Sequence, residues 1–212
     1  MARAKAILQS EFPYTISARC INKEWFNVPL EQVWQIFCDN LALVHESHGL
    51  QIHSFVMMSN HFHLLASTPN ANISQCMLHF MTKSSKALTK AGNRINETFA
   101  GRHYKCILNE YNYFLNAYKY NYRNPIAAGI CERVEDYPFS TLPMKLGLSE
   151  KKIPVIEDTL LKEDRDGILK WLNKTPEPEM LEAARTAFKR PFFKSKNKRD
   201  SARPMLGPKD LI

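Results

Sequence analysis

Two neighbouring apolar segments constrain the fold of this 212-residue chain more than any other feature. Leu50 to Met58 and His61 to Ser67 are both β-prone, and only Ser59-Asn60 separates them. Apolar runs joined by two polar residues predict an antiparallel hairpin. A two-stranded hairpin is marginally stable in water, so further strands or helices must cover it. The sequence therefore predicts a small antiparallel sheet packed against helices.

Predicted strands and helices lie on both sides of this hairpin in the sequence. Before it, Phe12 to Ile21 alternates as a strand does, and an amphipathic helix runs from Pro29 to Gly49. After it, Asn72 with Gln75 resembles a capping box that opens a helix toward Gly92. A strand over Thr98 to Leu108 and a tyrosine-rich helix over Glu110 to Arg123 follow, and Asn124-Pro125 is expected to end that helix.

This order of elements predicts an α+β fold, with a ferredoxin-like antiparallel sheet covered by helices and a C-terminal helical and basic extension. Later signals are weaker, with helices expected over Glu157 to Leu172 and Glu177 to Ala187. The expected division is 1–145 for the main domain, 146–190 for a helical extension and 191–212 for an irregular basic tail.

Composition excludes several classes of protein. The chain is 44% hydrophobic, which is too much for a disordered chain, and no run of about 18 apolar residues could span a membrane. Five widely spaced cysteines without a Cys-x-x-Cys pair argue against disulfides and zinc-cysteine sites. We expect a cytoplasmic protein.

The net charge of +8 is unevenly distributed. The segment 185–209 holds nine Lys or Arg and one acid, whereas 83–123 carries a local +6 together with eight Tyr or Phe. Cations bind phosphates and exposed rings stack on bases, so the second segment favours single-stranded nucleic acid. The charge of the segment 185–209 alone equals the net charge of the chain. We expect removal of this basic segment to weaken salt-sensitive DNA affinity without abolishing the chemistry.

The chemistry is carried by two small groups of residues. His61 and His63 lie two apart in a predicted strand, so both imidazoles project from one face while Phe62 and Leu64 face the core. An isolated His-x-His is more often a pair of ordinary histidines, and a metal would need a third ligand. In the predicted tyrosine-rich helix, Tyr120 and Asn124 are one turn apart and could supply a nucleophile and a metal ligand to one centre.

These motifs together resemble the single-tyrosine HUH transposases, most closely the REP-associated tyrosine transposases of the IS200-like family. The similarity rests on residues 55–65, on Arg102-His103-Tyr104, on the segment 120–130 and on Tyr137-Pro138-Phe139-Ser140-Thr141. Within these blocks Ser59, Asn121 and Phe139 depart from the usual family residues without removing a chemical group.

The resemblance implies a mechanism. His61, His63 and Asn124 would bind Mg²⁺ or Mn²⁺, and Tyr120 would attack a phosphate of single-stranded DNA to form a 5′-phosphotyrosine bond and a free 3′-OH. The implied substrates are single-stranded hairpins of repetitive palindromes. The implied protein is bacterial, associated with the nucleoid, and either a monomer or a homodimer. Candidate DNA contacts are Arg19, Lys23, Lys83, Lys86, Lys90, Arg102 and Lys105.

Two other interpretations stay open at this stage. The fold could serve a sequence-specific DNA-binding protein that has lost turnover. It could also serve a zinc-dependent hydrolase that adds His53 or His103 to His61 and His63. Loss of activity on replacing Tyr120 separates the transposase from the hydrolase.

Overall fold

The computed structural model describes residues 7–93 and 97–212, and its centre is a four-stranded antiparallel sheet. The strand order is β2-β3-β1-β4. The strands are β1 (Tyr14–Arg19), β2 (Gln51–Met57), β3 (His61–Ser67) and β4 (Tyr104–Ile107). The predicted hairpin is confirmed as β2 and β3, with the turn at Met58 to Asn60.

Strand β3 lies between β1 and β2, which are themselves connected through α1 (Leu30–His48). In the same way β1 separates β3 from β4, which are connected through α2 (Ile73–Ala91). The units β1-α1-β2 and β3-α2-β4 each hold a strand of the other unit between their own two strands, which is the ferredoxin-like arrangement. The predicted α+β class is confirmed.

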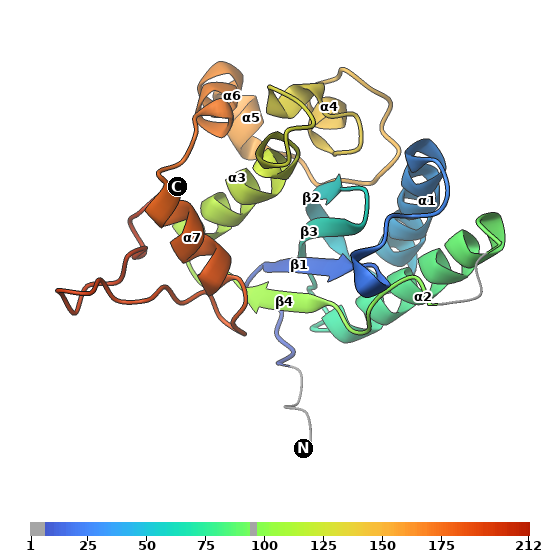
Figure 1. Cartoon of the computed structure of the whole chain (residues 1–212), viewed down its shortest axis with the longest axis horizontal. Coiled ribbons are helices and arrows are strands. Elements are labelled where there is room, and N and C mark those ends of the chain that lie inside the picture. The colour runs from blue at the N-terminus through green and yellow to red at the C-terminus, as the bar shows by residue number, and fades with distance from the viewer. Residues whose placement is uncertain (1–6, 94–96) are drawn as a thin grey trace.

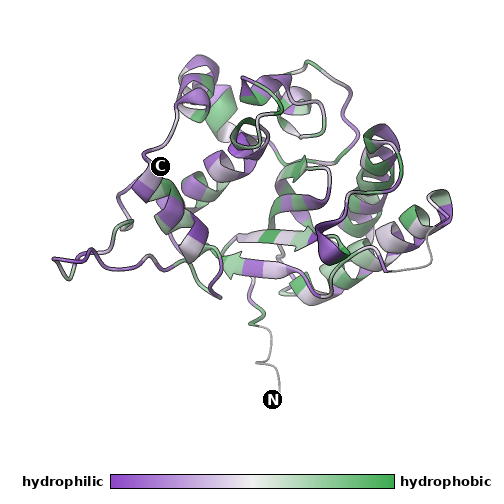
Figure 2. Cartoon of the chain, in the orientation of Figure 1, coloured by the Kyte–Doolittle hydropathy of each residue, from purple (hydrophilic) through white to green (hydrophobic). Residues whose placement is uncertain are grey.

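The helices cover both faces of the sheet (Figure 1). Helices α1 and α2 pack against one face around a cluster of phenylalanines, Phe26, Phe37, Phe55, Phe62, Phe80 and Phe99. Helix α1 is hydrophobic along much of its length (Figure 2), in keeping with six buried residues. Helix α3 (Tyr111–Ala127) packs on the opposite face, where Val56, Leu65, Cys106 and Tyr122 belong to a second core.

Two local expectations are wrong. Helix α3 does not end at Asn124 but continues through Pro125 to Ala127. Proline at this position removes only the bond to the Asn121 carbonyl, and that carbonyl accepts a hydrogen bond from Asn124 Nδ2 at 3.4 Å instead. Asn72 does precede α2, but its Nδ2 donates to the His48 carbonyl at 2.9 Å, so it forms no side-chain cap.

Short helices follow along the edge of α3. They are α4 (Leu142–Lys145), α5 (Thr159–Glu163), α6 (Arg165–Asn173) and α7 (Pro178–Ala187). The single helix expected over Glu157 to Leu172 is divided at Asp164, whose side chain caps α6 by accepting from the Gly167 amide. No helix in the described parts of the chain is both long and apolar enough to cross a membrane.

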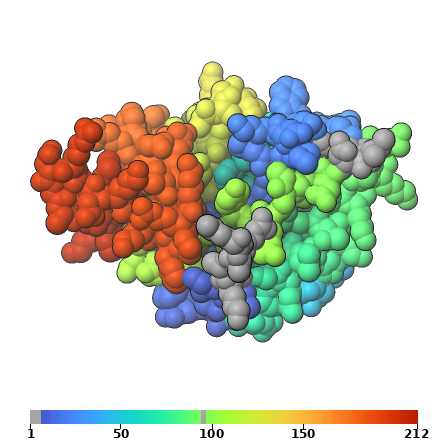
Figure 3. Space-filling view, turned by 60° about the horizontal axis from the view of Figure 1, so that its bottom comes forward, coloured from blue at the N-terminus to red at the C-terminus, as the bar shows by residue number. Residues whose placement is uncertain are grey.

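The segment after α7 has no helix or named strand, yet it packs closely on the molecule. Phe193 is 4% exposed, Leu206 1% and Ile212 6%. The Ile107 amide donates to the Pro191 carbonyl at 2.8 Å, and the Asn116 side chain binds the backbone of Asp210 and Ile212. In the space-filling view the C-terminal part, in orange and red, forms one whole side of the molecule (Figure 3).

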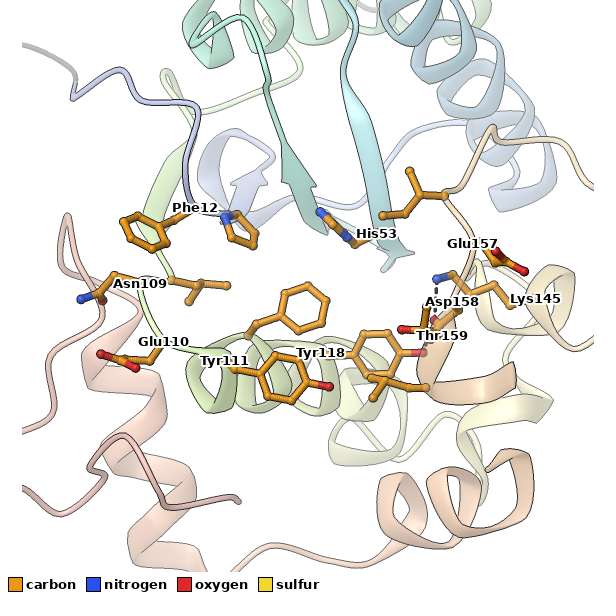
Figure 4. Close-up of a pocket in the computed structure, with 15 residues that line it drawn as sticks. Phe12, His53, Asn109, Glu110, Tyr111, Tyr118, Lys145, Glu157, Asp158 and Thr159 are labelled. Atoms are coloured by element: carbon orange, nitrogen blue, oxygen red, sulfur yellow. Dashed lines mark hydrogen bonds and ion pairs between the residues drawn. The ribbon is translucent and has the colours of Figure 1, made fainter. Parts of the chain in front are cut away.

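A buried charged network ties α3 to the end of α4 and the start of α5. Asp158 Oδ2 accepts hydrogen bonds of 2.6 Å from both Tyr118 Oη and Lys145 Nζ (Figure 4), and Asp158 Oδ1 accepts from the Leu161 amide. The Lys145 and Asp158 side chains are only 5% and 8% exposed. Burial lowers the pKa of Lys145, while the neighbouring Asp158 carboxylate favours its charged form.

We expect Asp158→Ala to reduce the free energy of unfolding by about 3–5 kcal/mol, because it leaves a buried ammonium without its counter-ion. The measurement is chemical denaturation followed by circular dichroism. The matched control is Glu157→Ala, which removes an exposed carboxylate paired with Lys162, and its denaturation midpoint should stay close to the wild-type value. Equal midpoints for the two variants would show that the buried network does not stabilise the fold.

Candidate active site

The two histidines of β3 project from the face of the sheet that α3 covers. Their ring centroids lie 5.0 Å apart. The alternate residues of the strand, Phe62 and Leu64, are fully buried in the core on the opposite face of the sheet. The predicted alternation of the strand is therefore confirmed. Strand β1 places Ser17 opposite His63 and Arg19 opposite His61.

Both imidazoles are held neutral by their surroundings. Burial, followed by the nearby Arg19 guanidinium, lowers the pKa of His61 to about 4. Burial also lowers the pKa of His63 well below its usual value, with His61 and Arg19 adding to the effect. His61 Nδ1 lies 2.7 Å from Asn60 Oδ1, which orients the ring. A neutral imidazole offers a nitrogen lone pair to a metal without first losing a proton.

Tyr120 reaches His63 from α3. Its ring centroid is 5.8 Å from that of His63, and on another side it is 5.1 Å from the ring of Phe188, directly after α7. Tyr120 and His63 line one cavity of about 420 Å³. The remaining lining residues are Thr15, Ile16, Ser17, Arg19, Tyr104, Glu182, Arg185, Phe188 and Lys189. One chain thus brings the predicted nucleophile next to His63, whereas His61 does not line this cavity.

Asn124 is placed differently from the other predicted ligands. Its Nδ2 donates to the Tyr120 carbonyl at 2.8 Å, within its own helix. It lines a neighbouring cavity of about 410 Å³, to which Tyr120 and Arg185 also contribute. The structure therefore brings Asn124 close to Tyr120 but does not place it in the cavity of His63.

The predicted DNA contacts are scattered over the molecule. Arg19 alone lines the cavity of Tyr120. Lys23 and Arg102 are exposed in the segments after β1 and before β4, and Lys83, Lys86 and Lys90 are exposed on α2, in the layer across the sheet. Lys105 corrects the prediction, since its Nζ is buried 5.8 Å from the Tyr14 ring centroid on the α1/α2 side of the sheet. A buried amine on that side is not available to a phosphate at the catalytic face.

A separate cavity of about 480 Å³ lies on another side of α3, between Phe12, His53, Phe114 and Tyr118 (Figure 4). His53 Nε2 is 2.7 Å from Ser67 Oγ there, and burial lowers the pKa of His53 to about 4. None of the predicted catalytic or metal-binding residues lines this cavity. His53 therefore does not join His61 and His63, as the zinc-hydrolase interpretation requires.

The histidine pair fits a metal in one respect that the structure shows directly. His63 Nε2 is buried and has no hydrogen-bond partner within 7–93 and 97–212. An unpaired buried nitrogen is costly unless something occupies its lone pair. Over the same residues, no three His, Cys, Asp or Glu side chains converge as a metal site. A metal would therefore need an amide, water or substrate oxygen beyond the two imidazoles.

Sequence reasoning missed part of the site. The Tyr120 cavity is also lined by Arg185, Phe188 and Lys189. From the sequence, the two cations entered only the summed charge of the segment 185–209. Their helix is recognisable from its pattern, but its contact with Tyr120 joins residues more than 60 positions apart. No local pattern records such a contact.

Comparison with known protein families finds a match over part of the chain. Residues 24–120 match the family model described as "Transposase IS200 like", a segment that contains His61 and His63 and ends at Tyr120. This segment, a little under half of the chain, is thus similar to a family of DNA-processing enzymes.

One solved structure shares the fold, and a second matches more weakly. One is described as a REP-associated tyrosine transposase bound to a REP hairpin; it has 17% identity, a TM-score of 0.58, and the match covers 74% of this chain and 94% of that one. Another is described as a putative transposase from Deinococcus radiodurans, with 14% identity, a TM-score of 0.37 and coverage of 50% and 84%. Comparison with the curated proteins finds no match.

Proposed function

We propose that this protein cleaves and rejoins single-stranded DNA at hairpins, using Tyr120 as the nucleophile. The observation that carries the proposal is the shared cavity of Tyr120 and His63, whose rings lie 5.8 Å apart. The family match, which contains both histidines and the tyrosine, supports it.

In the proposed reaction the Tyr120 phenol oxygen attacks the scissile phosphorus. A bond from tyrosine oxygen to phosphorus forms, and the bond from phosphorus to the 3′ oxygen breaks. The phenol gives up its proton, and the leaving oxygen takes one up to become a 3′-OH. Because the phosphotyrosine keeps the bond energy, a second 3′-OH can reverse the attack and rejoin DNA.

His61 and His63 are the residues that would hold Mg²⁺ or Mn²⁺, and their neutral rings and the unpaired His63 Nε2 fit that role. Asn124 as a third ligand remains a prediction. When bound, the ion supplies Lewis-acid neutralisation of charge on the non-bridging phosphate oxygens. Arg19 beside His61 contributes a fixed positive charge at the same place.

The substrate proposed is a single-stranded hairpin of the REP type. A neighbour of the same fold is described as bound to a REP hairpin. Here Tyr104 is 70% exposed at the edge of the cavity, where an unpaired base could stack on its ring. Since one chain supplies both histidines and Tyr120, the proposed active unit is a monomer with its tyrosine in cis.

The test uses single-stranded oligonucleotides that carry palindromes flanking the gene, incubated with the protein and Mn²⁺. A 5′-phosphotyrosine leaves the protein on the downstream fragment. A 3′-labelled oligonucleotide should therefore give a labelled protein band that resists denaturation, and a 5′-labelled one a shortened free product. We expect Tyr120→Phe to abolish the labelled band, because phenylalanine has no oxygen to attack phosphorus.

The matched control is Tyr111→Phe, which removes the same hydroxyl from a tyrosine of α3 that is 63% exposed and lies outside the Tyr120 cavity. This variant should form the adduct at the wild-type rate. Binding of the hairpin without an adduct, across several palindromes and metals, would favour the second candidate instead: a DNA-binding protein that retains the fold but not turnover.

A further inference from the structure

We propose that α7 and the turn after it bind the phosphate backbone of the DNA strand beside Tyr120, through Arg185 and Lys189. This inference rests on the function proposed above and specifies how the substrate is held. Both residues lie outside the segment 24–120 that matches the family model. Both line the cavity that contains Tyr120 and His63.

The charges of this cavity are arranged for an anion. Arg185 and Lys189 enter it from α7 and its turn, and Arg19 enters it from β1. Among the residues that the structure describes, Glu182 is the only acidic one that lines this cavity. Three cations against one carboxylate leave a positive cavity around the phenol of Tyr120, and a cavity of one sign concentrates ligands of the other sign.

Internal ion pairs do not neutralise Arg185 of α7 or Lys189 of the turn after it. Arg185 lies 3.7 Å from Glu182, but their side chains are 44% and 65% exposed, and an exposed pair of this kind contributes little. The Lys189 side chain forms no ion pair or hydrogen bond with any part of the chain that the structure describes. Both cations are therefore available to phosphate oxygens.

The helix that carries them is fixed in place. Ala183, Ala184 and Ala187 are buried in the core formed with α3, and their small side chains let the helix approach closely. Phe188 contacts Tyr120 on one side and Phe193 on the other, with ring centroids 5.1 and 5.3 Å away. A phosphate site on such a helix is preorganised, so less conformational entropy is lost on binding.

The experiment compares Arg185→Ala/Lys189→Ala with wild-type protein. A matched control, Lys151→Ala/Lys170→Ala, removes two exposed lysines that do not line the Tyr120 cavity. The probe is a labelled oligothymidylate of about 20 nucleotides, which exceeds the site size of a small single-strand binding domain. Affinity is measured by fluorescence anisotropy over a series of salt concentrations.

We expect the cavity variant to bind about tenfold or more weakly at low salt. Its slope of log affinity against log salt should become shallower by about 1.4, because each lost phosphate contact on a single strand contributes about 0.7. The control should keep the wild-type slope. If the cavity variant and the control have the same affinity and slope, the inference is overturned, whatever the adduct assay gives. Absence of an adduct in wild-type protein would instead overturn the proposed cleavage reaction.

Discussion

Replacing both His61 and His63 with alanine is expected to reduce formation of the covalent DNA adduct by about 10³-fold or more, while the fold stays intact. A bound divalent ion stabilises the transition-state charge by several kcal/mol, and about 4 kcal/mol corresponds to a factor of 10³ in rate. The two rings lie 5.0 Å apart on one face of β3, so they can act on one ion. The double substitution removes both imidazoles, of which His63 lies beside Tyr120.

The measurement has two parts. Single-turnover adduct formation in Mn²⁺ gives the rate, and calorimetric titration with Mn²⁺ gives metal binding without reference to activity. The control is His79→Ala on α2, a histidine on the other side of the sheet. The control should retain both the rate and the binding of Mn²⁺. Wild-type Mn²⁺ binding in the double variant would mean that another set of residues holds the ion.

The histidine double variant and Tyr120→Phe together separate the transposase from the two other interpretations. A hydrolase that used the histidines without the tyrosine would lose activity in the double variant but keep it in Tyr120→Phe. A protein that only binds DNA would show no adduct in any variant and unchanged affinity for the hairpin. Only the transposase interpretation predicts that wild-type protein forms the adduct and that the histidine double variant and Tyr120→Phe both lose it.

The fold could be predicted from local sequence because its signals are local. The hairpin turn at Ser59-Asn60, the alternation of β3 and the apolar stripe of α1 are each contained in one short segment. The order of these elements along the chain allows few strand orders in the sheet, and the observed order β2-β3-β1-β4 is one of them. The pairing of His61 with His63 follows from the same period of two.

The completion of the site could not be predicted in this way. Phe188 and Arg185 reach Tyr120 only because alanines of α7 are buried against α3, a contact between distant segments. Lys105 illustrates the opposite error. Its neighbours in the sequence are basic and aromatic, yet its place in β4 directs it away from the histidines. Charge counted along a sequence says nothing about which face of a sheet receives it.

Removing residues 191–212 is expected to lower the free energy of unfolding by about 5–8 kcal/mol. Three large side chains in this segment, Phe193, Leu206 and Ile212, are almost fully buried, and burying each contributes about 1.5–3 kcal/mol. The deletion also exposes Tyr113, whose ring stacks on Phe193 at 4.2 Å, and leaves the buried Asn116 amide without partners. Since domains of this size are stable by about 5–15 kcal/mol, the shortened chain should be largely unfolded at moderate temperature.

Thermal and chemical denaturation of the shortened chain measure this loss. The control keeps the full length and carries Lys194→Ala and Lys198→Ala, two exposed cations of the same segment. That variant should unfold at the wild-type midpoint, because it loses charge but no buried surface. A stable, active shortened chain would restore the expectation from charge alone, that the segment adds only salt-sensitive affinity. The buried side chains argue against that expectation, because Phe193, Leu206 and Ile212 bury apolar surface in the core shared with α3.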